Sequence, residues 1–297
     1  MGRDKCNVLA AAGQQAALFD EPPAPCPTPY DDIVILPPQD VLMTLQQVKS
    51  PVKTTILDPW YNKGVGGVRP DYYEWLSSVL HAAAKVSDNI FLWGFPEIVY
   101  KVLDHLPPEV NLVAWLTWYY KNCPSVIRGW RSAQLACLHI AKPSAKLYPE
   151  HFLNGAQLEK QRQGKLRYMP GPPSVIETPL LVGFVGRDEQ TGHPAQKPVK
   201  AIEPLILMTT EEGDTVLDPM CGSGTTGVVC GSLKRRALLC DVSEEYTRMA
   251  ERRLGIRRGA RYVSPDAETV APDPCAIHAV REPKNVAYRR TRSRGKR

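Results

Sequence analysis

The sequence predicts an α/β protein whose mostly parallel sheet is covered by helices on both faces. Strand-like apolar segments alternate with amphipathic helical patterns along the 297 residues, as in consecutive β-α-β units. In addition, one short apolar strand ends in an acid and leads through a glycine-rich turn into a helix, which is the layout of a nucleotide-binding loop. The length suits one large domain or one domain with an insertion.

Hydrophobic periodicity and turn residues give the expected elements in order. We expect strands near residues 54–57, 89–94, 112–118, 134–141, 215–217 and 237–241. Apolar residues spaced three and four apart predict a helix from Tyr72 to Ala83, and further helices are expected at 96–106, 202–208 and 225–233. Ser243 is a good N-cap for a last helix that ends near Leu254.

Composition divides the chain into three parts. Residues 1–30 are rich in Ala, Gln and Pro and are expected to have little fixed structure, whereas 31–277 form the predicted catalytic domain. Inside that domain, residues 142–178 are polar and carry Lys160, Arg162, Lys165 and Arg167. A plain surface insertion would explain this stretch, but its position within the sheet suggests target recognition. The tail 278–297 has eight Lys/Arg against one acid, which predicts either a solvated end or a hold on nucleic-acid phosphates.

Other classes of protein are disfavoured by composition. Hydrophobic residues make up 43% and charged residues 23% of the chain, which is ordinary for a soluble globular protein. No stretch of about 18 apolar residues predicts a membrane span. The eight cysteines include no Cys-x-x-Cys pair and no metal-finger spacing, so we expect reduced thiols, no metal site and a cytoplasmic location.

The glycine loop is the first candidate site. Its expected ligand-binding residues are Asp218, Pro219, Cys221, Gly222, Ser223, Gly224, Thr225 and Thr226. The Gly-Lys-Ser/Thr ending of a phosphate-binding P-loop is lacking, and the three glycines 222, 224 and 227 alone are a weak dinucleotide signal. Asp241 follows at the end of the next predicted strand, where a carboxylate can accept hydrogen bonds from both ribose hydroxyls of an adenosine.

Two other segments are notable. The tetrapeptide Asp58-Pro59-Trp60-Tyr61 ends the first predicted strand, and by itself it would be interpreted as a proline turn with packed aromatics. The segment from His193 to Pro198, His-Pro-Ala-Gln-Lys-Pro, precedes the helix that leads to the glycine loop.

Taken together, the three segments resemble those of the beta-arranged DNA amino-methyltransferases over residues 53–254. The usual family forms are Asp-Pro-Pro-Tyr, His-Pro-Thr-Gln-Lys-Pro and Asp-Pro-Phe-Cys-Gly-Ser-Gly-Thr-Thr. Trp60, Ala195 and Met220 are the departures in this chain. The resemblance implies a Rossmann-like methyltransferase fold of a seven-stranded type, S-adenosylmethionine as cofactor and double-stranded DNA as partner. It also implies that His193, Gln196 and Lys197 line the cofactor pocket.

The same resemblance implies catalysis by Asp58, Pro59, Trp60 and Tyr61. A carboxylate and a carbonyl can accept the two N–H groups of a flipped base's exocyclic amine, and they can stabilise the charge that builds as a methyl group arrives. Asp at the first position favours N6 of adenine over N4 of cytosine. The alternatives are an N4-cytosine enzyme, an inactive DNA-binding homologue and an NAD-dependent oxidoreductase. The sequence leaves a homodimer open and identifies no cognate restriction nuclease.

Overall fold

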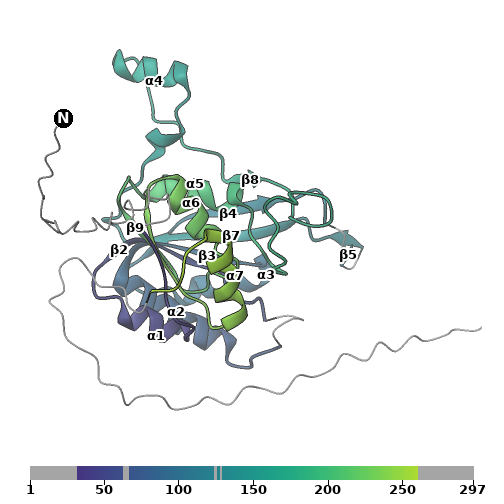
Figure 1. Cartoon of the computed structure of the whole chain (residues 1–297). Helices are drawn as coiled ribbons and strands as arrows, with labels where there is room; N and C mark the ends of the chain where they lie inside the picture. Colours follow the sequence, from purple (N-terminus) through teal and green to yellow (C-terminus); the bar gives the residue numbers. More distant parts are fainter. Residues whose placement is uncertain (1–31, 63–66, 124–125, 128, 260–297) are drawn as a thin grey trace, which may run out of the picture. The chain divides into compact units, whose positions relative to one another are not determined.

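An eight-stranded mixed sheet forms the centre of the protein in the computed structural model, which describes residues 32–62, 67–123, 126–127 and 129–259 (Figure 1). In spatial order its strands are β1 (Ile33–Ile35), β10 (Arg236–Leu239), β9 (Thr215–Asp218), β2 (Val52–Leu57), β3 (Ser87–Gly94), β7 (Gln134–Ala141), β4 (Asn111–Tyr119) and β8 (Val175–Glu177). Strand β7 runs antiparallel to both its neighbours, and the other pairs are parallel. The predicted mixed, mostly parallel sheet is therefore confirmed.

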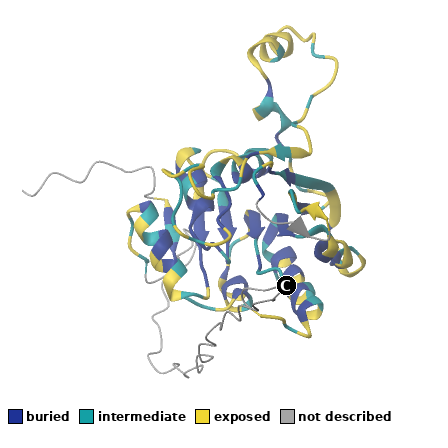
Figure 2. Ribbon diagram, turned by 90° about the vertical axis from the view of Figure 1, so that its right-hand side faces the viewer, coloured by how far each residue is buried: buried dark blue, intermediate teal, exposed yellow. Residues whose placement is uncertain are grey.

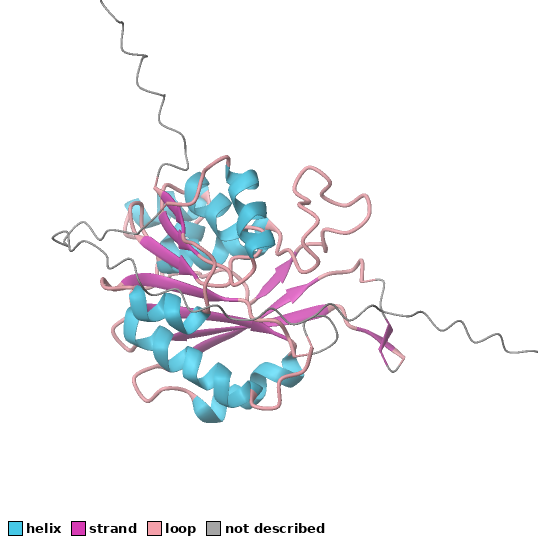
Figure 3. Ribbon diagram, turned by 60° about the horizontal axis from the view of Figure 1, so that its bottom comes forward, coloured by secondary structure: helices cyan, strands magenta, loops and turns pink. Residues whose placement is uncertain are grey.

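Helices cover both faces of the sheet (Figure 3). One face carries α1 (Val41–Gln47), α2 (Tyr72–Val86), α3 (Pro96–Val99) and the 3-10 helix η1 (Tyr100–His105). The other carries α5 (Val199–Thr209), α6 (Thr225–Ser232) and α7 (Glu244–Leu254). Successive strand residues point to opposite faces, so Leu57 and Leu92 pack into the first core and Ile56 and Phe91 into the second. Because both faces are covered there, the central strands β3 and β7 are almost fully buried, and buried residues form the dark centre of Figure 2.

The chain changes direction between β2 and β9. From β2 it proceeds to the neighbour β3 on one side, and from β9 it proceeds to β10 on the other side. The two strands are parallel neighbours, with Thr55 opposite Leu217, so Asp58 and Asp218 both lie at the carboxyl edge. In open α/β sheets a ligand crevice forms at this kind of switch point.

Several expected elements differ in the structure. Strand β1 and helix α1 were not expected, and β8 adds an eighth strand to the seven-stranded type. The segment expected to be one helix at 96–106 is α3 followed by η1, and Asp241 lies two residues beyond the end of β10 rather than inside a strand. Residues 1–30, expected to be unstructured, and the basic tail 278–297 lie outside the described part of the chain.

The 142–178 segment has more structure than its sequence pattern predicted. It contains the 3-10 helix η2 (Pro149–Phe152), the helix α4 (Gly155–Arg162) and β8. A capping box between Asn154 and Gln157 begins α4, which has no buried residue and projects from the body beyond α5 (Figure 1). Elsewhere, β5 (Val126–Ile127) and β6 (Trp130–Arg131) make a separate hairpin. In the part of the chain that is described, no helix is long and apolar enough to cross a membrane.

Candidate active site

The turn between β9 and α6 requires glycine at two positions. Gly222 and Gly224 have φ of +49° and +74°, in the region that residues with side chains rarely adopt. A Cβ at Gly222 would lie 2.9 Å from Nε2 of His193, and one at Gly224 would lie 2.9 Å from Cβ of Ala250. The chain therefore passes close to the 193–198 segment on one side and to α7 on the other.

Asp218 stabilises this turn from within. Its Oδ1 accepts the main-chain N–H of Met220 at 3.1 Å, and its Oδ2 accepts the hydroxyl of Thr226 at 2.5 Å. Burial raises the pKa of Asp218 to about 7, although the two hydrogen bonds act in the opposite direction. Both oxygens are occupied by the loop itself, and Pro219 beside it is buried. Asp218 thus shapes the turn.

Asp241 joins the turn to α7. Its Oδ2 accepts the N–H of Gly222 and its Oδ1 accepts the N–H of Ser243, both at 2.9 Å. Burial raises its pKa, against these two hydrogen bonds. Next to it, Val242 is apolar and 73% exposed, which the sequence did not single out. A carboxylate and an exposed apolar side chain therefore lie side by side beyond the end of β10.

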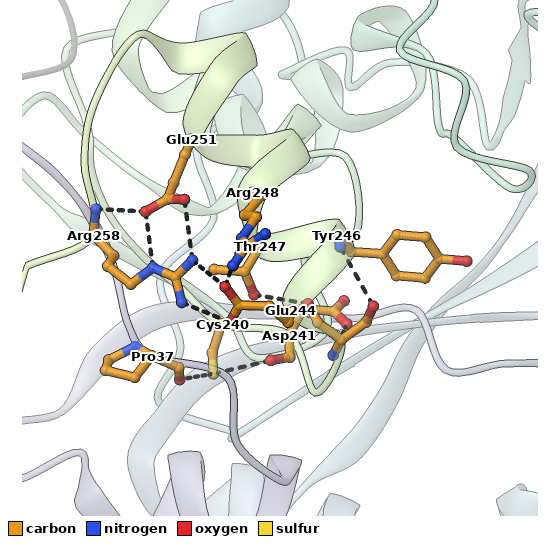
Figure 4. A network of polar contacts seen from close by, with 10 residues as sticks. Pro37, Cys240, Asp241, Glu244, Tyr246, Thr247, Arg248, Glu251 and Arg258 are labelled. Carbon is orange, nitrogen blue, oxygen red and sulfur yellow. Dashed lines mark hydrogen bonds and ion pairs between the residues drawn. The ribbon is translucent and has the colours of Figure 1, made fainter. Parts of the chain in front are cut away.

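Charged residues fix helix α7 beside the turn. Arg258 binds Glu244 and Glu251 of α7 (Figure 4). Before the N-terminus of this helix, the thiol of Cys240, next to Asp241, donates to the carbonyl of Pro37. On the side that faces the turn, Arg253 donates to the hydroxyl of Thr225 at 2.7 Å and to Oγ of Ser223 at 3.2 Å. The position of the glycine turn thus depends on α7 as well as on β9.

The Asp58–Tyr61 tetrapeptide lies across the switch point from the turn. The hydroxyl of Tyr61 donates to Oδ1 of Asp58 at 2.8 Å, and its ring contacts Phe95 edge-on with the ring centroids 4.9 Å apart. Burial first, and the neighbouring Asp58 second, raise the pKa of Tyr61 well above its ordinary value. Tyr61 therefore remains a neutral hydroxyl that orients the carboxylate.

Trp60 packs away from this carboxylate. Its ring lies against Tyr72 and Trp75 of α2, with centroids 5.5 and 4.8 Å apart, and its carbonyl accepts the Tyr72 hydroxyl at 2.8 Å. Trp60, which stands where the family has a second proline, is thus held by contacts with helix α2. Of the four residues expected in catalysis, Trp60 is the one whose ring packs on α2.

The 193–198 segment brings its three expected pocket residues to different places. His193 lies against Gly222 and contacts the ring of Tyr246, with the centroids 4.3 Å apart. Burial lowers its pKa, so the imidazole is neutral near neutral pH. By contrast, Gln196 binds Thr191 and the carbonyl of Glu189, which lie just before the 193–198 segment.

Lys197 reaches the Asp58–Tyr61 tetrapeptide. Its Nζ donates to Oδ2 of Asp58 at 2.5 Å and to the hydroxyl of Tyr61 at 2.8 Å. Lys197 was expected in the cofactor pocket, and in the structure its side chain contacts the carboxylate of Asp58. No local pattern predicts this pair, because the two residues are 139 positions apart.

Comparison with known proteins identifies the family of the chain. The model of the N6/N4 DNA methylase family matches residues 52–252, which include the tetrapeptide, the 193–198 segment, the glycine turn and Asp241. The chain belongs to this DNA methylase family. The methylase is 41% identical over 240 residues to the DNA adenine methyltransferase YhdJ of Escherichia coli K12, an alignment that covers 73% of this chain and 81% of YhdJ.

Solved structures share the fold of the methylase at lower identity. The crystal structure of the M1.HpyAVI-SAM complex matches with a TM-score of 0.58 and 22% identity, over 75% of this chain and 100% of that one. The cytosine-N4-specific PvuII DNA methyltransferase matches with a TM-score of 0.55 and 16% identity, over 80% and 90% of the two chains. The cofactor expected from the sequence is thus the one named in a complex with this fold. The predicted DNA amino-methyltransferase family is confirmed.

Proposed function

We propose that this methylase transfers a methyl group from S-adenosylmethionine to N6 of an adenine that is flipped out of double-stranded DNA. The observation that carries the proposal is the position of Asp58 across the switch point from the glycine turn. Asp58, at the end of β2, would hold the target amine, and the turn after β9 would hold the cofactor. Because these strand ends are neighbours, the amine and the methyl group would be brought together.

The residues of the turn fit the cofactor. Gly222 and Gly224 allow a close approach to the main chain, and each oxygen of Asp241 has lone-pair capacity beyond the one bond that it accepts. Val242 offers an apolar surface to an adenine ring, and neutral His193 borders the turn. We infer that Asp218, Pro219, Cys221, Ser223, Thr225 and Thr226 hold the shape of this site. When bound, the cofactor supplies an electrophilic methyl group.

Asp58 is the proposed acceptor for the target amine. The lone pair of an exocyclic amine is delocalised into the base, so the amine becomes nucleophilic only when its N–H groups are held out of that arrangement. The Asp58 carboxylate and the Pro59 carbonyl can accept these two hydrogens and stabilise the developing positive charge. Tyr61 fixes the carboxylate through its 2.8 Å hydrogen bond.

The choice of adenine rests on two supports. An Asp stands at the first position of the tetrapeptide, and YhdJ, whose name states adenine, covers most of the chain. N4 of cytosine is the second candidate because the cytosine-specific PvuII enzyme has the same fold. The test is to incubate the purified protein with duplex DNA and labelled cofactor, then digest the DNA to nucleosides. N6-methyladenine is expected, N4-methylcytosine would contradict the choice of base, and no methylated base would contradict the activity.

Two surfaces are candidates for contact with DNA. The 142–178 segment, proposed from its sequence for target recognition, exposes Lys160 and Arg162 on α4. The segments that leave the carboxyl ends of β4 and β8 expose Trp130 and Phe184, each 82% accessible. Alanine substitutions at Lys160 and Arg162, compared with substitutions at Trp130 and Phe184, would show by DNA affinity and by site preference which surface reads the sequence. The proposal places the methylase in the cytoplasm of a prokaryotic or phage-infected cell; it leaves a homodimer open and names no cognate nuclease.

A further inference from the structure

The ammonium group of Lys197 is buried against the proposed catalytic carboxylate. The Lys197 side chain is 6% exposed and that of Asp58 is 20% exposed, and Nζ lies 2.5 Å from Oδ2. The rings of Tyr61 and Trp93 lie close to the same ammonium, with their centroids 5.5 and 5.6 Å from Nζ. A buried ammonium is costly unless a carboxylate compensates it, so each member of this pair stabilises the charge of the other.

The main chain of Lys197 is fixed as well. Its carbonyl accepts the hydroxyl of Thr225, the first residue of α6, at 2.9 Å. Thr225 is in turn held by Arg253 of α7 at 2.7 Å. One residue therefore connects the carboxylate after β2 to the glycine turn after β9.

The hydrogen bonds also set the direction of the carboxylate. Asp58 receives Tyr61 on Oδ1 and Lys197 on Oδ2, so each oxygen already has one donor from the protein. An ionised carboxylate has about four lone-pair sites, so acceptor capacity remains for the N–H of a target amine. A protonated carboxyl would have less acceptor capacity and no negative charge to oppose the developing cation.

We propose that Lys197 is a positioning residue for methyl transfer, which keeps the half-buried Asp58 ionised and turned toward the target amine. The inference rests on the proposed role of Asp58. It differs from the expectation that Lys197 lines the cofactor pocket, because its side chain contacts the acceptor and only its carbonyl contacts the turn.

The carboxylate of Asp58 influences the pKa of several neighbouring groups, and these groups remain unchanged in the test. They come from the elements packed around it, namely Tyr61, Tyr72, Cys137, His193, Asp218 and Asp241. Burial raises the pKa of the Cys137 thiol and of Tyr61, so both are neutral. Lys197 is thus the cation that makes direct contact with Asp58 among the described residues.

The test compares Lys197→Met, Lys197→Arg and the control Lys200→Met, which removes an exposed lysine three residues along. The turnover of DNA methylation is measured across pH, and cofactor affinity is measured by calorimetry. Lys197→Met should lose activity at neutral pH and regain it at high pH. In its pH–rate profile the fall in turnover on the acid side should move to higher pH, with about tenfold loss of turnover at neutral pH for each pH unit of that displacement. Lys197→Arg should keep the wild-type pH–rate profile on the acid side. Cofactor affinity should change less than about twofold in both Lys197 variants. Lys200→Met should match the wild type.

Three results would overturn the proposal. An equal loss at every pH would mean that Lys197 has a merely structural role, and a parallel loss of cofactor affinity would return it to the cofactor pocket. If Lys197→Met unfolds, the double variant Asp58→Asn/Lys197→Met decides, because removing both charges should restore the melting temperature; no restoration would reject the pairing. A wild type that methylates no DNA would instead contradict the proposed function, so the two failures are distinguishable.

Discussion

Asp241 accepts the main-chain N–H of Gly222 at 2.9 Å, so the acid expected to bind a ribose also holds the glycine turn in place. Its other oxygen accepts the N–H of Ser243 at the start of α7. A substitution at Asp241 should therefore affect the cofactor directly and through the shape of the turn.

Asp241→Ala is expected to weaken cofactor binding. Loss of hydrogen bonds to a charged acceptor costs on the order of 1–3 kcal/mol, and the released turn adds to that cost. Isothermal calorimetry with S-adenosylmethionine measures the change, with Glu212→Ala, an exposed acid paired with Lys234, as the control. Unchanged affinity in Asp241→Ala would remove this residue from the cofactor site.

Gly224→Ala is expected to destabilise the protein more than Gly213→Ala. Both glycines have positive φ, +74° and +82°, so both substitutions incur the same kind of backbone strain, about 1–2 kcal/mol. Only at Gly224 would the new Cβ meet a neighbour, 2.9 Å from Cβ of Ala250, whereas nothing lies within 4 Å at Gly213. Thermal unfolding of the two variants gives the comparison. Equal losses would show that contact with α7 does not fix the turn.

Asp58→Ala should abolish methyl transfer while cofactor binding persists. Removal of a preorganised group that faces developing charge typically costs about 10²–10³ in rate. Asp58→Asn, which keeps the shape of the side chain, separates loss of charge from loss of packing around Lys197. Labelled methyl incorporation into duplex DNA is measured beside calorimetric cofactor affinity. Near-normal turnover in both variants would refute the acceptor role.

His139→Gln should reduce the loss of stability at acid pH. Burial lowers the pKa of His139 to about 4, below the value in the unfolded chain, so the unfolded chain binds more protons between these values. Stability from this residue is present above about pH 6.5 and is lost as pH falls toward 4, by at most about 1.4 kcal/mol per unit. Denaturant unfolding at both ends of this window measures the change.

The matched control is His81→Gln, because His81 is exposed. The raised pKa of Asp218, about 7, contributes an opposite slope, but it does so equally in wild type and variant. The difference between the two therefore isolates His139. An identical acid dependence in wild type and His139→Gln would contradict the assignment.

Deletion of residues 284–297 should weaken DNA binding about equally for all sequences. The tail 278–297 is strongly basic, and contacts between lysine or arginine and phosphates release counterions without reading bases. The deleted protein should therefore show a shallower dependence of affinity on salt concentration. An unchanged slope would leave the tail without a role in DNA binding.

Local chemistry in the sequence determined the arrangement of strands, turns and helices around the site. The strand before Asp58, the glycines at 222 and 224 and the cap Ser243 all have signals within a few residues, and each lies where it was expected. These features depend on backbone conformation and on periodicity, which neighbouring residues set. Short or polar elements were not predicted. Strand β1 has only three residues, too few to show a hydrophobic periodicity, and helix α4 has no apolar face.

Tertiary structure alone decided which side chains meet. Lys197 contacts Asp58, and Trp60 packs on α2, only in the folded chain, where the ends of β2 and β9 lie side by side. Likewise, Asp241 reaches Gly222 only after β9 and β10 pair side by side. Contacts between distant residues depend on this packing, and the free energy of burying a charge or a ring is fixed only when all its neighbours are in place.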